Sequence, residues 1–197
     1  MLAGGAASRF GGAPKGLERV GGLRIVDRVA AALTEATGAP PLLVANAPDA
    51  AQWLPGARLA ADLRPGMGSL GGIHAAVCAA PAPVVCVAWD MPFVPAALLR
   101  ALAAGLAEAD VVVPASGGRR GVEPLCAAYG PACRAAIEAR MDAGDLRAIG
   151  FHPLVRVAVL SLEEVRGYGD PETLFFNVNT AGELAEAEER WQRGSSR

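Results

Sequence analysis

The first seventeen residues hold glycines and charged side chains that are suited to binding a polyphosphate. Glycine pairs occur at positions 4–5 and 11–12. Arg9 and Lys15 accompany them, and Lys15 is the only lysine among 18 basic residues. Glycine backbone can approach phosphates closely and turn its N–H groups toward them, while two cations neutralise their charge. The spacing fits neither a Walker loop nor a GxGxxG dinucleotide turn. We interpret the segment as a triphosphate-binding loop, with a flexible loop carrying solvated cations as the alternative.

Asp90 is the candidate metal ligand. It follows the apolar run 84–89 and precedes Pro92, so we expect it where a buried strand ends. Open α/β sheets bind ligands at the carboxyl ends of their strands. Mg²⁺ typically takes one or two protein carboxylates together with substrate phosphates and water, so one aspartate can hold a magnesium ion that a nucleotide brings. The alternative is a cap for the helix expected to open at Pro95.

Polar residues at other strand ends are further candidates. Asp62 follows a short apolar run and could accept hydrogen bonds from a base or ribose, and Asn46 follows another such run, although both residue types also favour ordinary turns. Asn177 and Asn179 are separated by one residue, so in an extended segment both amides point to one face. One could touch the metal or pyrophosphate, and the other could orient a second substrate. Asn179 could equally be structural, because Thr180 is expected to cap a helix.

The cysteines and histidines do not have the spacing of a zinc site. No CxxC pair is present, and only His74 and His152 could add further soft ligands. We expect His74 to be packed or at the surface rather than to act as a base. Buried reduced thiols are expected at all four cysteines, which are Cys78, Cys86, Cys126 and Cys133.

Short apolar runs alternate with longer segments of helical period, which indicates an α/β protein built around a mostly parallel sheet. We expect helices over residues 24–37 and 95–106, and a third from a Thr180–Glu183 capping box to about residue 190. Only Met1 and Leu2 precede the first glycine loop, so the strand leading into it should be very short. The other expected strands are residues 41–45, 57–61, 84–89, 110–114, 125–129 and 155–160.

Composition narrows the class of protein. The chain has 197 residues, of which 52% are hydrophobic and 19% charged, so it should fold, and we expect one domain over residues 1–197. A net charge of -2 gives no basic surface for nucleic acid. No uncharged apolar run is long enough for a membrane span, and the glycine-rich start does not resemble a secretory signal. We therefore expect a cytoplasmic protein that binds neither nucleic acid nor membrane.

Five segments together resemble one family. Leu2-Ala3-Gly4-Gly5, Ser8-Arg9-Phe10-Gly11-Gly12 and Pro14-Lys15-Gly16-Leu17 resemble the signature loop of nucleotidyltransferases, and specifically that of the molybdenum cofactor guanylyltransferases. Four further segments fit that family in the same order and span nearly the whole chain. They are Ala61-Asp62 with the glycine-rich turn 66–72, the Asp-x-Pro at Asp90-Met91-Pro92, the acceptor-side Glu123-Pro124-Leu125, and Asn177-Val178-Asn179-Thr180.

The resemblance implies a three-layer α/β fold of the nucleotide-diphospho-sugar transferase type, with a mostly parallel, Rossmann-like sheet and helices on both faces. The implied reaction is Mg²⁺-dependent transfer of GMP from GTP to molybdopterin, with release of pyrophosphate. The resemblance also implies catalytic roles for Arg9, Lys15 and Asp90. It implies phosphate contacts from the amides of Gly4, Gly5, Gly11 and Gly12, and a role toward the acceptor substrate or the metal for Asn177 and Asn179. The implied nucleotide contacts are Leu2, Ala3, Gly4, Gly5, Lys15, Asn46, Asp62 and Asp90, with Asp90 as the metal ligand. Handover to or from other proteins of cofactor biosynthesis is also implied.

The choice of base rests on position 4. The guanine-using members of the superfamily resemble Leu-Ala-Gly-Gly and the cytosine-using relatives Leu-Ala-Ala-Gly, so Gly4 favours GTP. The chain departs from the family pattern at Ala13-Pro14, which replaces a more usual acidic residue, and at Phe10, which replaces a methionine. Two alternatives stay open: a nucleotidyltransferase that uses CTP or a sugar-phosphate acceptor, and a nucleotide-binding regulator without turnover.

Overall fold

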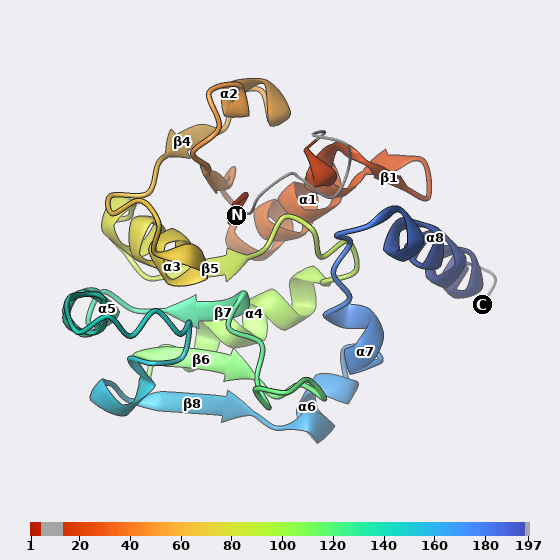
Figure 1. The fold of residues 1–197 in the computed structure, drawn as a ribbon. Coiled ribbons are helices and arrows are strands. Elements are labelled where there is room, and N and C mark those ends of the chain that lie inside the picture. The colour runs from red at the N-terminus through yellow and green to blue at the C-terminus, as the bar shows by residue number, and fades with distance from the viewer. Residues whose placement is uncertain (5–13, 196–197) are drawn as a thin grey trace.

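The computed structural model describes residues 1–4 and 14–195, in which strands and helices alternate along most of the chain (Figure 1). The strands are β1 (Arg19–Val20), β2 (Leu23–Arg24), β3 (Leu42–Val44), β4 (Arg58–Ala60), β5 (Val84–Val87), β6 (Val111–Pro114), β7 (Cys126–Tyr129) and β8 (Val157–Leu160). The α-helices are α1 (Ile25–Thr37), α2 (Ala50–Trp53), α3 (Gly68–Ala79), α4 (Ala96–Gly105), α5 (Cys133–Asp142), α6 (Leu162–Arg166), α7 (Pro171–Leu174) and α8 (Ala181–Ser195). The 3-10 helices are η2 (Lys15–Leu17) and η3 (His152–Leu154).

The central sheet is mostly parallel, as the sequence predicts. β3 pairs with β4 in parallel and β6 with β8 in parallel, while β7 runs antiparallel to both β5 and β6. The antiparallel direction of β7 was not foreseen. Residues 115–125 connect β6 to β7 without a helix, and a chain that makes no helical crossover returns beside its neighbour in the opposite direction.

The amino-terminal residues join the two parts of the sheet. Leu2 forms parallel bridges to both Val44 and Ala88, so residues 1–3 lie between β3 and β5. The Leu2 N–H donates to the Val87 carbonyl at 2.8 Å and the Ala3 N–H to the Val44 carbonyl at 2.8 Å. The strand that leads into the glycine loop is short, as predicted, and it is hydrogen-bonded on both sides.

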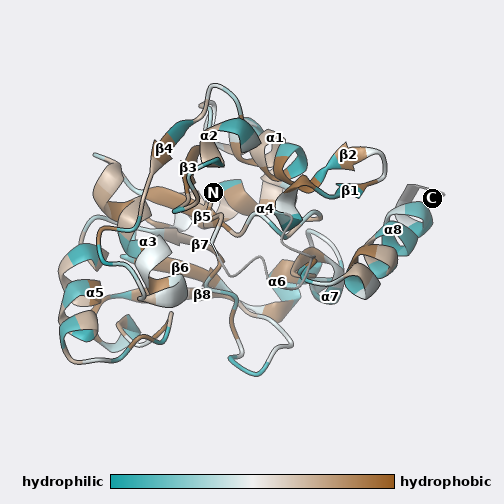
Figure 2. Ribbon diagram, turned by 45° about the horizontal axis from the view of Figure 1, so that its top comes forward, coloured by the Kyte–Doolittle hydropathy of each residue, from teal (hydrophilic) through white to brown (hydrophobic). Residues whose placement is uncertain are grey.

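Helices cover both faces of the sheet, which confirms the expected layers. α1 and α4 pack together on one face through buried side chains such as Val26 and Leu99. α3 and α5 pack together on the other face through side chains such as Ile73 and Ile137. Figure 2 shows apolar residues gathered in the central strands, with polar residues distributed over the outer helices and α8 extending away from the sheet. Burial of each such aliphatic side chain stabilises the fold by about 1.5–3 kcal/mol.

The predicted helices are present with small differences at their ends. α1 ends at Gly38, whose φ of 72° provides the left-handed cap that terminates many helices. Pro95 is the residue before α4 rather than part of its first turn. α8 continues to Ser195, beyond the expected end near residue 190. Within the described ranges, none of the helices is both long and apolar enough to cross a lipid bilayer.

Candidate functional site

A pocket of about 430 Å³ lies where the central parallel strands end. Because residues 1–3, β3, β4 and β5 run in one direction, the residues that follow them meet at the same edge of the sheet. The pocket is large enough for most of a nucleotide. All predicted site residues within the described ranges line it: Leu2, Ala3, Gly4, Lys15, Asn46, Asp62, Asp90, Asn177 and Asn179. The predicted residues Gly5, Arg9, Gly11 and Gly12 lie outside the described residues.

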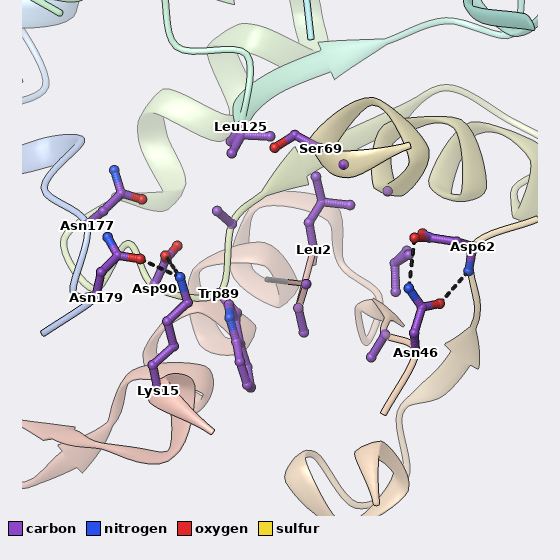
Figure 3. A pocket seen from close by; sticks show the side chains of 17 residues that line it. Leu2, Lys15, Asn46, Asp62, Ser69, Trp89, Asp90, Leu125, Asn177 and Asn179 are labelled. Carbon is purple, nitrogen blue, oxygen red and sulfur yellow. Dashed lines mark hydrogen bonds and ion pairs between the residues drawn. The ribbon is translucent and has the colours of Figure 1, made fainter. Parts of the chain in front are cut away.

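One end of the pocket is built around an ion pair between Lys15 and Asp90 (Figure 3). The Lys15 Nζ also donates to Asn179 Oδ1 at 2.6 Å. Both charged side chains are largely removed from solvent, with exposed fractions of 18% for Lys15 and 7% for Asp90. Three segments that are distant in the sequence therefore meet at a single cation.

Asp90 retains one oxygen for a ligand. Its Oδ2 accepts the Lys15 hydrogen bond, whereas the buried Oδ1 has no hydrogen-bond partner among the described residues. A buried carboxylate oxygen without a partner is costly unless a ligand satisfies it. A hard divalent cation fits this donor chemistry. Asp90 does not cap α4, because Pro95 occupies the cap position of that helix.

Trp89 fixes the position of Lys15 through the adjacent glycine. The Gly16 backbone lies so close to the Trp89 ring that a Cβ at position 16 would fall 2.3 Å from a ring carbon. Trp89 is itself held by stacking on Trp53, with ring centroids 4.7 Å apart. Only glycine therefore lets η2 approach the end of β5 closely enough for Lys15 to reach Asp90.

Asn46 and Asp62 form the opposite end of the pocket, beyond Leu2 (Figure 3). The Asn46 Nδ2 donates to Asp62 Oδ2 at 2.8 Å, and the Asp62 backbone N–H donates to Asn46 Oδ1 at 2.8 Å. This reciprocal pair ties the end of β3 to the end of β4. It holds the Asp62 carboxylate where it can accept hydrogen bonds from a ligand.

The first turn of α3 forms another part of the wall, through Gly68, Ser69 and Gly72. Gly66 and Gly68 have φ values of 85° and 58°, which favour glycine and allow the chain to turn sharply into the helix. The first N–H groups of a helix have no intrahelical partner, and the helix dipole favours an anion there. Gly68 and Ser69 were absent from the residues predicted individually, although the glycine-rich turn that contains them was recognised.

The two asparagines before α8 have different surroundings. Asn179 contributes its side chain to Lys15, and its backbone N–H donates to the Glu183 carboxylate at 2.8 Å. The Glu183 N–H donates to the Thr180 hydroxyl at 3.2 Å, so the predicted Thr180–Glu183 interaction is present at the start of α8. Asn177 lines the pocket and donates to the Phe175 carbonyl at 3.0 Å. The site and the helix start therefore share the same short segment.

Glu123 and Leu125 approach the pocket from the segment before β7. Leu125 lines the pocket, and its N–H donates to the Glu123 carboxylate at 3.0 Å. Burial raises the pKa of Glu123, the Leu125 N–H opposes that rise, and the nearby charge of Asp90 adds to it. The Glu123 carboxyl is therefore harder to ionise than an exposed one, chiefly because it is buried.

His74 lies outside the pocket and is buried, with 2% of its surface exposed. Its Nε2 is 3.0 Å from Glu138 Oε1 and 3.4 Å from Cys78 Sγ. The expectation that His74 is packed is confirmed, but its association with Cys78 and Glu138 was missed. The four-residue spacing of His74 and Cys78, which places both on one face of a helix, was the available signal. All four cysteines are free thiols, as expected, but Cys78 is half-buried rather than buried because it lies toward the solvent end of α3.

The class of protein that this fold and this pocket define is the nucleotidyltransferase, an enzyme that binds a nucleoside triphosphate at the carboxyl edge of a mostly parallel sheet. The chain belongs to the family of MobA-like NTP transferase domains, which it matches over residues 1–157. Nucleotidyltransferases of this family act with a divalent metal, for which the free oxygen of Asp90 is a suitable donor.

Individual relatives agree with this family. The chain is 39% identical to a probable molybdenum cofactor guanylyltransferase of Pelotomaculum thermopropionicum, over 95% of this chain and 89% of the relative. It is 35% identical to a molybdenum cofactor guanylyltransferase of Desulfosudis oleivorans, over 95% of this chain and 92% of the relative. Among solved structures, molybdopterin-guanine dinucleotide biosynthesis protein A from Archaeoglobus fulgidus superposes with a TM-score of 0.79 at 27% identity, covering 98% of this chain and 97% of that one.

Proposed function

We propose that the protein transfers GMP from GTP to molybdopterin and releases pyrophosphate. The observation that carries this proposal is the two-ended pocket. The Asp62 carboxylate, which accepts a hydrogen bond from Asn46, lies at one end of the pocket. The Lys15–Asp90 pair lies at the other end, and one of its carboxylate oxygens has no partner among the described residues. The names of the relatives supply the acceptor and the base.

The two ends suggest how GTP is oriented. Asp62 is placed to accept hydrogen bonds from the N1–H and exocyclic amine of guanine, two donors that lie next to each other on the base. The triphosphate then extends past Leu2 toward Lys15 and Asp90, beside the first turn of α3. The N–H groups at the start of α3 can stabilise the anionic phosphates.

The charges of the pocket favour a metal that enters with the nucleotide. Among the described residues that line it, Lys15 is the only cation and Asp62 and Asp90 are both anionic. The described part of the wall is therefore net negative, and even with Arg9 added a triphosphate would bring excess negative charge, which a divalent cation between the phosphates and Asp90 would balance. We propose Mg²⁺, which prefers oxygen ligands and commonly binds through one carboxylate plus substrate phosphates.

Catalysis in this proposal is positioning and charge stabilisation. Asp90 would hold the metal, which supplies Lewis-acid stabilisation of phosphate charge when bound. Lys15 leaves its ion pair with Asp90 and contacts the phosphate oxygens, while Asn179 keeps the ammonium directed into the pocket. Arg9 and the amides of Gly4, Gly5, Gly11 and Gly12 complete the phosphate contacts. The molybdopterin phosphate is already ionised, so displacement at the α-phosphorus requires little help from a base.

The acceptor is proposed to approach from the side of Asn177 and the segment 123–125. Asn177 and Leu125 line the pocket near Asp90 but are distant from the end that holds Asp62 (Figure 3). A cytoplasmic location and handover of the product to other proteins of cofactor biosynthesis belong to the same proposal. So does the treatment of residues 1–197 as one domain.

The direct test is pyrophosphate release from each of the four ribonucleoside triphosphates, with molybdopterin and Mg²⁺. We expect release with GTP only, and none when molybdopterin or Mg²⁺ is omitted. Thermal unfolding under the same conditions provides a second measurement, because a ligand that binds only the native state raises the melting temperature. Equal release with CTP would contradict the assignment of the base. A melting shift with GTP but no product would contradict turnover.

A further inference from the structure

A second cluster of ligand-forming side chains lies where α3 packs against α5. His74 and Cys78 are four residues apart on α3, and Glu138 faces them from α5. The His74 Nε2, the Cys78 Sγ and a Glu138 carboxylate oxygen all lie within 4.8 Å of one another. None of these residues lines the nucleotide pocket.

The ligand types are those of a borderline-soft transition metal. Imidazole, thiolate and carboxylate are the protein ligands of Zn²⁺, at about 2.0–2.3 Å, in a site of three protein ligands and one water. Around a tetrahedral ion such ligand atoms lie roughly 3.3–3.8 Å apart, as follows from those bond lengths. The His74 Nε2 is already 3.0 Å from Glu138 Oε1 and 3.4 Å from Cys78 Sγ. Shifts of about 1 Å or less would therefore close the site.

The cluster is buried at its imidazole and open to solvent at its other two ligands. His74 has 2% of its surface exposed, and its Nε2, which faces Cys78 and Glu138, is the atom that would bind the ion. The Cys78 thiol and Glu138 are partly accessible, the Glu138 side chain at 29%, so an ion can enter from solvent.

Charge also favours a divalent ion at this position. One thiolate and one carboxylate balance the charge of Zn²⁺, and the neutral imidazole leaves that balance unchanged. Arg134 donates to Glu138 Oε1 at 3.1 Å and is exposed, so it can move aside or remain on the carboxylate. Binding would release the Cys78 thiol proton to solvent, because the ligand is the thiolate.

We propose that His74, Cys78 and Glu138 bind one Zn²⁺ or a similar transition-metal ion, separate from the metal at Asp90. The ion would link α3 to α5. The first turn of α3 lines the nucleotide pocket, so this link would hold that wall of the pocket in place. The site is structural in this proposal, since none of its three ligand residues lines the pocket.

Cobalt substitution tests the proposal without reference to enzyme activity. The full chain, freed of metal by a chelator, is titrated with Co²⁺ in excess Mg²⁺, which occupies hard oxygen sites. We expect one cobalt per chain and a thiolate-to-cobalt charge-transfer band in the near ultraviolet. Cys78→Ala should abolish the band, and Glu138→Gln should weaken binding by at least about tenfold, given that even indirect ligand contacts are worth 10- to 100-fold.

The matched control is Cys133→Ser. The Cys133 thiol donates to the Asp110 carbonyl at 3.1 Å, and a serine hydroxyl at this position can make the same hydrogen bond. The cobalt band should therefore remain in this variant. Absence of a band in the unsubstituted protein, or an unchanged band in Cys78→Ala, would overturn the proposal.

Alkylation gives an independent readout on the unsubstituted protein, which removes any question of folding. Cys78 is partly accessible, whereas the other three cysteines are buried. One equivalent of Zn²⁺ should therefore slow iodoacetamide labelling of Cys78 by at least about tenfold, because a metal-bound thiolate is not free to react. An unchanged labelling rate, measured by peptide mass spectrometry, would also reject the site.

Discussion

Lys15 and Asp90 determine the chemistry of the pocket at the scale of single residues. Asp90 is buried and Lys15 half-buried, and their ion pair leaves one aspartate oxygen without a partner among the described residues. The lysine therefore occupies one side of the carboxylate and leaves the other side for a cation. When a triphosphate binds, Lys15 can exchange the Asp90 carboxylate for the phosphate oxygens, so its ammonium always has an anionic partner.

Substitution of Lys15 by alanine should impair both catalysis and stability. We expect Lys15→Ala to fold but to lower kcat on the order of 10²- to 10³-fold, the usual cost of losing one transition-state contact. It should also destabilise the protein by about 3 kcal/mol in metal-free buffer, because Asp90 is left as an unpaired buried charge. Steady-state pyrophosphate release and urea unfolding measure the two effects. The control is Arg58→Ala, an exposed cation on β4 outside the pocket.

Near-normal turnover of Lys15→Ala would remove Lys15 from the proposed mechanism. The stability effect has its own check, because Mg²⁺ added together with GTP should restore part of the loss by pairing with Asp90. Unfolding midpoints that do not respond to Mg²⁺ in the presence of GTP, in both the variant and the unsubstituted protein, would contradict the assignment of the metal to Asp90.

The Asn46–Asp62 pair belongs to the nucleotide end of the pocket and should act on binding. Asn46→Ala removes both hydrogen bonds that hold Asp62, so the carboxylate loses its fixed orientation. We expect KM for GTP to rise about tenfold, equivalent to one hydrogen bond of about 1.4 kcal/mol, with kcat little changed. Gln52→Ala, which removes an exposed amide outside the pocket, is the control. A fall in kcat with unchanged KM would place Asn46 in the chemical step instead.

Sequence reasoning reached the identities of these residues but not their interactions. Asn46 and Asp62 were each predicted from the family resemblance, since their place after an apolar run would by itself have favoured ordinary turn residues. Their mutual hydrogen bonds depend on the register of β3 against β4, which pairs Val44 with Ala60. Register is a tertiary property, and a single sequence of two short strands does not specify it.

At the scale of elements, η2 and the end of β5 form one positioning device. Gly16 lies against the Trp89 ring, Trp89 stacks on Trp53, and Lys15 is thereby directed at Asp90. The sequence identified the glycine and the lysine as members of a loop. It contained no sign that the loop rests on a tryptophan 73 positions away from Gly16.

Gly16→Ala tests this device. The added Cβ would meet the Trp89 ring at 2.3 Å, and the ring cannot move freely because it stacks on Trp53. We expect a destabilisation of about 1–3 kcal/mol from overpacking and a fall in kcat of about tenfold or more as Lys15 is displaced. The matched control is Gly117→Ala, where a Cβ would meet nothing within 4 Å. Unchanged kcat would show that Lys15 reaches its partners without this contact.

The element order was largely predictable, and the exceptions have physical causes. Continuous apolar runs identified the strands of the central sheet because both faces are covered by helices. The direction of β7 was missed, since a short apolar run carries no information about whether it pairs in parallel or antiparallel. α3 was not among the helices predicted with bounds, because it is apolar on nearly all sides and lacks the periodicity of a half-exposed helix.

At the scale of the whole molecule, the pocket spans the junction between two parts of the sheet. Asn46 and Asp62 follow β3 and β4, whereas Asp90 follows β5, and residues 1–3 pair with both sides. A nucleotide that contacts both ends therefore bridges the two parts. Binding should stabilise the fold as a unit rather than order one local loop.

The response of global stability to pH should reveal a half-buried histidine that the fold favours in its neutral form. His152 lies in η3 between α5 and β8, against the Phe151 ring, and its Nε2 has no partner among the described residues. Burial lowers its pKa below the ordinary value of 6.5. In the unfolded chain His152 takes up a proton near pH 6.5, whereas in the native protein it does so only at lower pH. The native state is therefore favoured above pH 6.5 and loses stability as the pH falls from there toward the native pKa.

Replacing His152 by glutamine removes this titration while keeping a polar side chain. The free energy of unfolding, measured in urea from pH 7.5 to pH 5, should fall less steeply for His152→Gln than for the unsubstituted protein. Glu123 acts in the opposite sense over the lower part of this range. Burial raises its pKa above 4.5, so its ionisation costs the native state stability as the pH rises from that value. Glu123→Gln should accordingly steepen the dependence that His152→Gln flattens. Two variants with the same slope would show that neither group is neutralised by burial, and that the acid sensitivity of the fold arises elsewhere.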